Sequence, residues 1–148
     1  MLQTIIIVFV AFILAYVLAL VVLRNKNRKI EQRGLSNKLD KIFVQNKWIE
    51  IEQVSKLGSP SHFKTSIMEA DKLVDYTLKF RGVKGETFGE RLKNAKSEFS
   101  NYSDYNNLWF AHKVRNNIAH ETAYELNSAE AKRAIEYFKK ALKELGAM

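Results

Sequence analysis

The sequence predicts an all-α protein: an antiparallel four- to five-helix bundle preceded by one N-terminal transmembrane helix. Three observations lead to this prediction. Beyond about residue 35 the apolar residues recur at helical spacing, no segment alternates apolar and polar residues as strands do, and residues 4–23 form one uncharged apolar run. The expected organisation is an anchor over residues 1–23, a basic linker over 24–36 and a helical bundle over 37–148.

The apolar run "TIIIVFVAFILAYVLALVVL", residues 4–23, has the length of a membrane-spanning helix. At about 1.5 Å per residue it extends roughly 30 Å, the thickness of the hydrocarbon core of a bilayer. A buried core helix is a poor alternative, because the run is apolar on every side. A cleaved signal peptide is a sharper alternative, but "MLQT" carries no positive charge, the run is long, and no small-x-small cleavage site follows it.

Basic residues follow the apolar run. Residues 24–34 hold five basic residues and one acid, which leaves 19 basic and 15 acidic residues in the rest of the chain. By the positive-inside rule we expect one pass through the inner membrane, with the N-terminus outside and the C-terminal domain in the cytoplasm. Each of these positive charges also favours anionic lipid by about 1 kcal/mol. The mild basicity of the remaining domain permits an RNA or phosphate partner without arguing strongly for one.

The first two helices of the bundle are marked by glycine, serine and proline. The first is expected from about Asn37 to Lys56, and Gly58 ends it. The second is expected to begin with Ser59 as N-cap and Pro60 as its first residue. Its apolar residues keep helical spacing to about Arg81.

Capping residues also mark the third and fourth helices. Thr87 and Glu90 form a T-x-x-E capping box, which predicts a third helix through about Phe99. Asp104 is expected to cap a fourth helix that reaches His120.

The fifth helix is expected to start after Asn127 or Ser128, with Glu130 near its third position, and to run to Gly146. Short connections between amphipathic helices favour antiparallel neighbours, and therefore a bundle. The expected core face of this helix comprises Ala131, Ala134, Ile135, Phe138, Leu142 and Leu145.

On a helical wheel, the fourth helix carries polar residues beside its apolar stripe. Arg115 falls on the edge of the stripe, where a guanidinium is costly without a partner or a ligand. His112 lies one turn before Arg115, and Asn116 directly follows it. Arg115 and His120 are separated by about 140° and about 7.5 Å, so the two side chains do not face the same way. The stripe itself comprises Leu108, Ala111, Val114 and Ile118.

The motif "VRNNIAHE", followed by "SAEAKRAIEYFKKALKEL", resembles the HEPN superfamily of helical-bundle proteins. The signature of that superfamily is an arginine, then a polar residue that is often asparagine, then a histidine a few residues on. The upstream segment "EADKLVDYTLKFRGVKGETFGERLKNA" also resembles the second-helix region of small bacterial members. The likeness covers about residues 38–146 and leaves out the apolar run.

The resemblance implies a metal-independent endoribonuclease that uses no cofactor and acts as a homodimer, with two motifs facing each other across a cleft. By position, Arg115 would hold the scissile phosphate, His120 would act as general acid or base, and Asn116 would orient the site. Guanidinium binds phosphate in a bidentate manner, and imidazole transfers protons near neutral pH. Other members of the superfamily only bind RNA or a protein partner. The alternative is therefore a non-catalytic, membrane-tethered interaction module.

Two further residues are weaker candidates for supporting roles. Asp71 on the second helix is placed to reach across the bundle and orient Arg115, and His112 lies beside the motif. A metal site is not expected, because a zinc pair on a helix needs histidines four positions apart and Asn116 occupies that position between His112 and His120. The chain has no cysteine, which excludes disulfides, zinc–thiolate sites and a thiol nucleophile.

Overall fold

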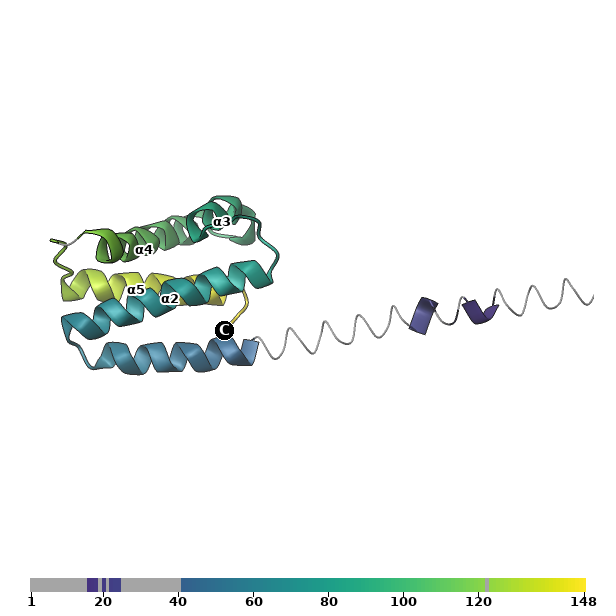
Figure 1. The fold of residues 1–148 in the computed structure, drawn as a ribbon, viewed down its shortest axis with the longest axis horizontal. Helices are drawn as coiled ribbons and strands as arrows, with labels where there is room; N and C mark the ends of the chain where they lie inside the picture. The colour runs from purple at the N-terminus through teal and green to yellow at the C-terminus, as the bar shows by residue number, and fades with distance from the viewer. Residues whose placement is uncertain (1–15, 19, 21, 25–40, 122) are drawn as a thin grey trace, which may run out of the picture. The chain divides into compact units, whose positions relative to one another are not determined.

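In the computed structural model of the protein, the secondary structure of the described residues is helical, and they contain no strand (Figure 1). This confirms the prediction of an all-α protein. The chain divides into two compact units, Met1–Leu39 and Asp40–Met148. The described residues are 16–18, 20, 22–24, 41–121 and 123–148.

Most of the expected membrane span lies outside the described residues, as does the expected start of the first bundle helix at Asn37. The described residues within 4–23 are 16–18, 20, 22 and 23, which are helical and exposed. None of the helices formed by described residues combines the length and the apolar character that crossing a bilayer requires. The anchor over 1–23 and the linker over 24–36 therefore stay predictions.

The first described helix of the bundle covers residues 41–56 and ends where Gly58 takes a φ of 76°. Glycine adopts this left-handed conformation without the strain that a Cβ would bring. Helix α2 (Pro60–Phe80) follows, and the Ser59 hydroxyl accepts a hydrogen bond from the backbone N–H of His62 at 3.3 Å. The predicted serine cap and proline start are therefore confirmed.

Helix α3 (Phe88–Asn94) begins at the predicted cap. The Thr87 hydroxyl accepts a hydrogen bond from the backbone N–H of Glu90 at 3.2 Å. The Glu90 carboxylate accepts in turn from the backbone N–H of Glu86 at 2.8 Å, one residue before the position that a capping box requires. Both contacts still satisfy donors that the start of the helix would otherwise leave unpaired.

The prediction that the third helix continues to Phe99 is wrong. After Ala95 the chain tightens into the short 3-10 helix η1 (Lys96–Glu98), and Phe99 itself is extended. This change of direction buries the Phe99 ring, whose centroid lies 5.9 Å from that of Tyr105. The capping signal at Thr87 predicts where α3 begins, but it does not specify this packing of Phe99.

Helix α4 (Tyr102–His120) starts earlier than predicted, and its N-cap is Asn101. The Asn101 side chain accepts a hydrogen bond from the backbone N–H of Ser103 at 2.8 Å. The expectation that Asp104 caps this helix is wrong, because Asp104 lies within the first turn. A carboxylate at that position interacts favourably with the helix dipole.

Helix α5 (Ser128–Glu144) has Asn127 as its N-cap, in agreement with the sequence. The Asn127 side chain accepts a hydrogen bond from the backbone N–H of Glu130 at 2.8 Å. The helix ends before Gly146, which takes a φ of 67°. The predicted end is therefore two residues too late.

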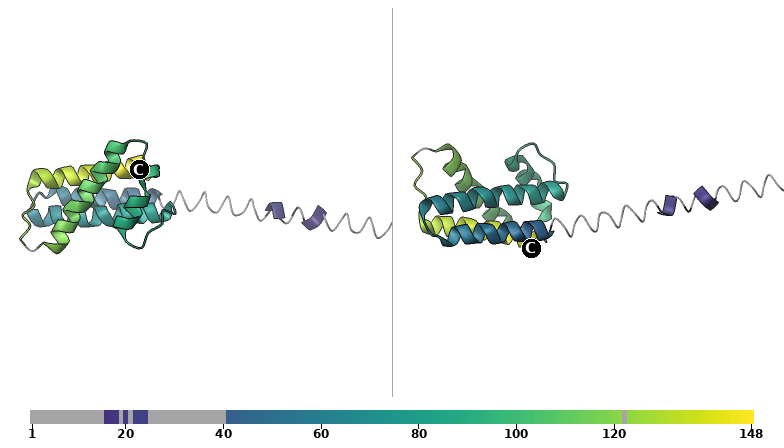
Figure 2. Two further views of the ribbon diagram at one scale, coloured as in Figure 1. Left: turned by 90° about the horizontal axis from the view of Figure 1, so that it is seen from above. Right: turned by 60° about the horizontal axis from the view of Figure 1, so that its bottom comes forward.

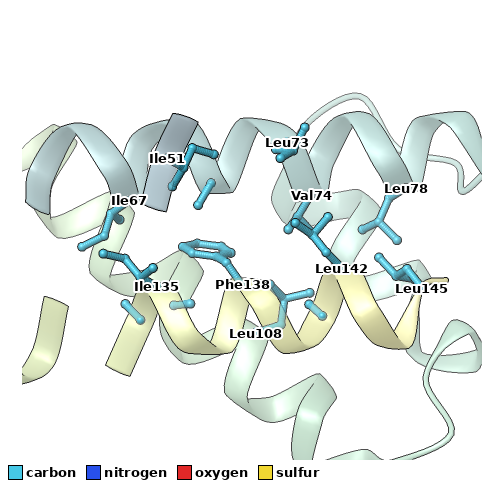
Figure 3. Packing of buried hydrophobic residues seen from close by; sticks show 14 of the residues in the cluster. Ile51, Ile67, Leu73, Val74, Leu78, Leu108, Ile135, Phe138, Leu142 and Leu145 are labelled. Atoms are coloured by element: carbon cyan, nitrogen blue, oxygen red, sulfur yellow. The ribbon is translucent and has the colours of Figure 1, made fainter. Parts of the chain in front are cut away.

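Helix α5 is the centre of the bundle. It packs against both α2 and α4, while the helix over residues 41–56 lies beside α2. Helix α4 crosses these helices obliquely, as Figure 2 shows. In the core, Phe138 and Leu142 of α5 lie between α2 and α4, and both are fully buried (Figure 3). Their neighbours in this core include Ile67, Val74 and Leu78 of α2 and Leu108 of α4.

Replacing the central ring of the core gives a direct test of this packing. Phe138→Ala is expected to lower the free energy of unfolding by about 3–5 kcal/mol, because it removes buried apolar surface and leaves a cavity. Urea unfolding monitored by circular dichroism measures the change. Ile49→Ala is the control, since Ile49 is 52% exposed and its loss should change stability by no more than about 0.5 kcal/mol. Equal effects of the two substitutions would contradict the assigned core.

Candidate functional site

Four polar side chains from two helices meet where α2 and α4 pack together. Asp71 comes from α2, and His112, Arg115 and Asn116 come from neighbouring turns of α4. Asp71 and His112 are buried, with 4% and 7% of their surfaces exposed, whereas Arg115 and Asn116 are partly exposed. We call these four side chains the Asp71 ring.

The contacts among the four side chains form a closed cycle. Asp71 Oδ1 lies 2.8 Å from Nδ1 of His112, and Asp71 Oδ2 lies 3.3 Å from Nε of Arg115. Arg115 Nη1 donates to Oδ1 of Asn116 at 3.1 Å. The cycle is completed by the amide nitrogen of Asn116, which lies 3.1 Å from Nε2 of His112. Each member therefore has two partners within the ring.

The Asp71 carboxylate occupies an environment that opposes its charge. Burial raises the pKa of Asp71 above its ordinary value. The hydrogen bond from His112 and the positive charge of Arg115 lower the pKa, but burial outweighs them. An ionised carboxylate in such a place depends on its partners, since removing one of them leaves a buried charge uncompensated. Asp71 therefore constrains the positions of His112 and Arg115.

Aromatic rings enclose His112 and keep it from the surface. The Phe88 ring of α3 meets the imidazole edge-on, with centroids 4.6 Å apart, and the Trp109 ring lies at 6.1 Å. Gly89 of α3 lies against the imidazole of His112, since a Cβ at that position would be 3.7 Å from Nε2. His112 therefore lies under α3, where an external ligand does not reach it.

The guanidinium of Arg115 extends from the Asp71 ring to the protein surface. Its side chain is 25% exposed, and Nη1 is held by Asn116. The buried Nε is near Asp71 but is not aligned for a hydrogen bond, so this contact is an ion pair. No described residue accepts a hydrogen bond from Nη2. The guanidinium is therefore fixed on one side and retains donors for a ligand on the other.

His120 does not belong to the Asp71 ring. It is the last residue of α4, its side chain is exposed, and no described residue forms a hydrogen bond or ion pair with it. Of the residues singled out in the sequence, the structure therefore brings together Asp71, His112, Arg115 and Asn116 and leaves His120 apart.

Sequence reasoning gave Asp71 and His112 less weight than their positions deserve. A signal was present for Asp71, because it lies four residues after Ile67 and three before Val74, on the buried face of α2. A carboxylate on an apolar stripe needs a partner. The exposed neighbour Glu69 pairs with Lys72 at 2.7 Å and lies outside the Asp71 ring.

A second buried polar cluster was not anticipated from the sequence, and its role is structural. The side chain of Arg91 is 6% exposed, and its Nε donates to Asp75 Oδ1 at 2.6 Å. Arg91 also donates to the carbonyl oxygens of Gly85 and Glu86, and so fastens the connection between α2 and α3. Burial alone would raise the pKa of Asp75, but its hydrogen bonds to Arg91 and Lys79 outweigh burial and lower it.

Among the described residues, no three histidine, cysteine, aspartate or glutamate side chains gather as they would around a metal ion. No protein-family model matches the sequence, no curated protein matches it, and no solved structure matches the fold. The chemistry of the Asp71 ring is therefore the main evidence on function.

The Asp75–Arg91 pair should make stability depend on pH. A carboxyl whose pKa is lowered by folding stabilises the protein above its ordinary pKa of 3.8, and this contribution disappears as the pH falls through the lower folded value. Asp75→Asn is expected to lower the free energy of unfolding at pH 7, with a difference from wild type that shrinks below about pH 3.8.

Urea unfolding between pH 7 and pH 2.5 or so tests this dependence. Glu69→Gln is the matched control, because the exposed Glu69–Lys72 pair should contribute little at any pH. A deficit in Asp75→Asn that stays constant down to the acid limit would contradict the assignment.

Proposed function

We propose that this chain is a HEPN-like helical domain that binds RNA through Arg115 and is held at the inner face of the membrane by one N-terminal span. The observation that carries the proposal is the Asp71 ring, which orients a partly exposed guanidinium through buried partners. Arginine is suited to phosphate because its planar donors match two phosphate oxygens at once.

The contacts of Arg115 hold its guanidinium in place for an anionic ligand. One carboxylate, Asp71, faces the guanidinium, and His112 shares that carboxylate. A guanidinium that is already oriented loses less side-chain freedom on binding, and this favours affinity.

The sequence supports the membrane location. Residues 4–23 form an uncharged apolar run, and five basic residues follow within positions 24–34. In this proposal the N-terminus lies outside, the domain faces the cytoplasm, and the basic segment contacts anionic lipid. Confinement to a membrane raises the effective concentration of the chain and favours a homodimer.

RNA cleavage is the catalytic form of this proposal. Arg115 neutralises the charge that develops on the scissile phosphate, and His120 transfers a proton at the ribose 2′-hydroxyl or the leaving oxygen. Because His120 lies outside the Asp71 ring, the His120 of a second copy completes the site. The reaction requires no metal.

The alternative is a non-catalytic interaction module that gathers RNA or a protein partner at the membrane. One observation favours it: no described residue holds His120, whereas a general acid or base needs a fixed geometry. The two forms differ in whether a cyclic-phosphate product forms.

The role of Arg115 is tested by a substitution that keeps its charge. Arg115→Lys retains a cation beside Asp71 but loses the planar fork, so affinity for single-stranded RNA is expected to fall about tenfold while stability changes little. Fluorescence anisotropy of the full chain in detergent, at one fixed salt concentration, measures the affinity.

A matched control makes the same charge-conserving substitution at another arginine. Arg133 is exposed on α5 and lies over the Phe110 ring at 4.3 Å, so Arg133→Lys should leave RNA affinity nearly unchanged. Equal losses in the two variants would indicate unspecific attraction to basic residues. Binding that Arg115→Lys does not weaken would reject the proposal.

Cleavage is tested by incubating the full chain with RNA in the presence of a chelator. His120→Gln is expected to abolish a cyclic-phosphate product and to leave RNA affinity within about threefold of wild type, because it removes the proton-transfer group and not the phosphate ligand. Binding without a product in the wild type would support the interaction module.

A mixture of Arg115→Lys and His120→Gln chains separates a shared site from a site within one chain. If each site uses Arg115 from one copy and His120 from the other, a mixed dimer holds one intact site, and the mixture regains part of the activity. No recovery would place both residues in one chain and overturn the composite site.

A further inference from the structure

The Asp71 ring admits a single pattern of protons. Arginine can only donate hydrogen bonds, so the atom of Asn116 that faces Arg115 Nη1 at 3.1 Å must be the amide oxygen. This fixes the orientation of the amide and directs its NH₂ group toward Nε2 of His112, at 3.1 Å.

The orientation of Asn116 then fixes the state of His112. An NH₂ group can only donate, so Nε2 of His112 must accept and carries no proton. The ring proton of the neutral imidazole is therefore on Nδ1, from which it is donated to Asp71 Oδ1 at 2.8 Å. A doubly protonated imidazole would place its Nε2–H against the NH₂ group of Asn116, so that two donors would face each other. Turning the amide over would instead place the NH₂ group against the N–H donors of Arg115.

We propose that His112 is the positioning residue of the site: held neutral with its proton on Nδ1, it fixes the amide of Asn116 and thereby the guanidinium of Arg115. The inference rests on the proposed function of Arg115 as a phosphate ligand. His112 itself does not touch the ligand, because it is 7% exposed and lies under Phe88 and Trp109. It acts only through the two contacts that it makes within the Asp71 ring.

The tautomer is observable in a chain whose Asp71 ring carries no substitution. Imidazole ¹⁵N NMR spectra of the full chain in detergent at pH 7 are expected to show one histidine with a protonated Nδ1 and a bare Nε2. His62→Gln and His120→Gln each remove one of the other two histidine signals, so the signal that both variants keep belongs to His112. A proton on Nε2, or on both nitrogens, would overturn the inference even if His112→Phe did not fold.

The effect on Arg115 is measured by hydrogen exchange of its Nε–H, which is buried against Asp71. In His112→Phe this proton is expected to exchange about tenfold faster, because the guanidinium is no longer held in place. Arg91 is an internal control, since its Nε–H donates to Asp75 in a separate cluster and should keep its wild-type rate. Unchanged exchange at Arg115 would reject the positioning role.

RNA affinity separates failure of this inference from failure of the proposed function. His112→Phe is expected to weaken RNA binding about as much as Arg115→Lys, although His112 is buried. Wild-type RNA affinity in His112→Phe would reject the positioning role alone. A wild-type chain that shows the expected tautomer and slow exchange at Arg115, but binds no RNA, would reject the proposed function and leave the positioning role intact.

Discussion

The buried carboxylate of Asp71 is the group on which the rest of the site depends. It lies between α2 and α4, where an ionised oxygen is costly unless a donor or a positive charge faces it. Its two oxygens face different residues of α4, His112 and Arg115. Two contacts one turn apart restrict both the rotation of α4 about its axis and its height against α2. The same carboxylate therefore sets the register between the helices and the direction of the guanidinium.

Helix α4 contributes both to the hydrophobic core and to the candidate site. One side packs Leu108 and Val114 against the centre of the bundle, where Phe138 fills the space between helices. The site residues of the same helix differ in exposure: His112 is buried, Arg115 is partly exposed and His120 is exposed. A rigid helix therefore presents a fixed guanidinium and a free imidazole on one short segment. In the proposed function, the fixed guanidinium serves binding, whereas catalysis depends on a second copy that positions His120.

Much of the fold could be predicted from the sequence, because Ser59, Thr87 and Asn127 cap their helices through local contacts. The boundaries at Phe99 and Asn101 could not be predicted in this way. Phe99 packs against Tyr105, and Asn101 and Asp104 are both good N-cap residues, of which the chain uses the first. Arg115 and Asn116 are adjacent on one helix, so the helical periodicity of the sequence predicts that both lie beside the apolar stripe of α4. The contact between Asp71 and His112 joins residues 41 positions apart, and no local pattern provides that pairing.

The closed cycle of the Asp71 ring also has a consequence for how this protein can vary. In a cycle, each residue satisfies its neighbours, so the first substitution leaves two groups without their partners. A second substitution at either neighbour in the Asp71 ring then removes a group that is already unsatisfied, and the two effects on stability should not add. Sequences related to this one are therefore expected to keep or replace the four residues together.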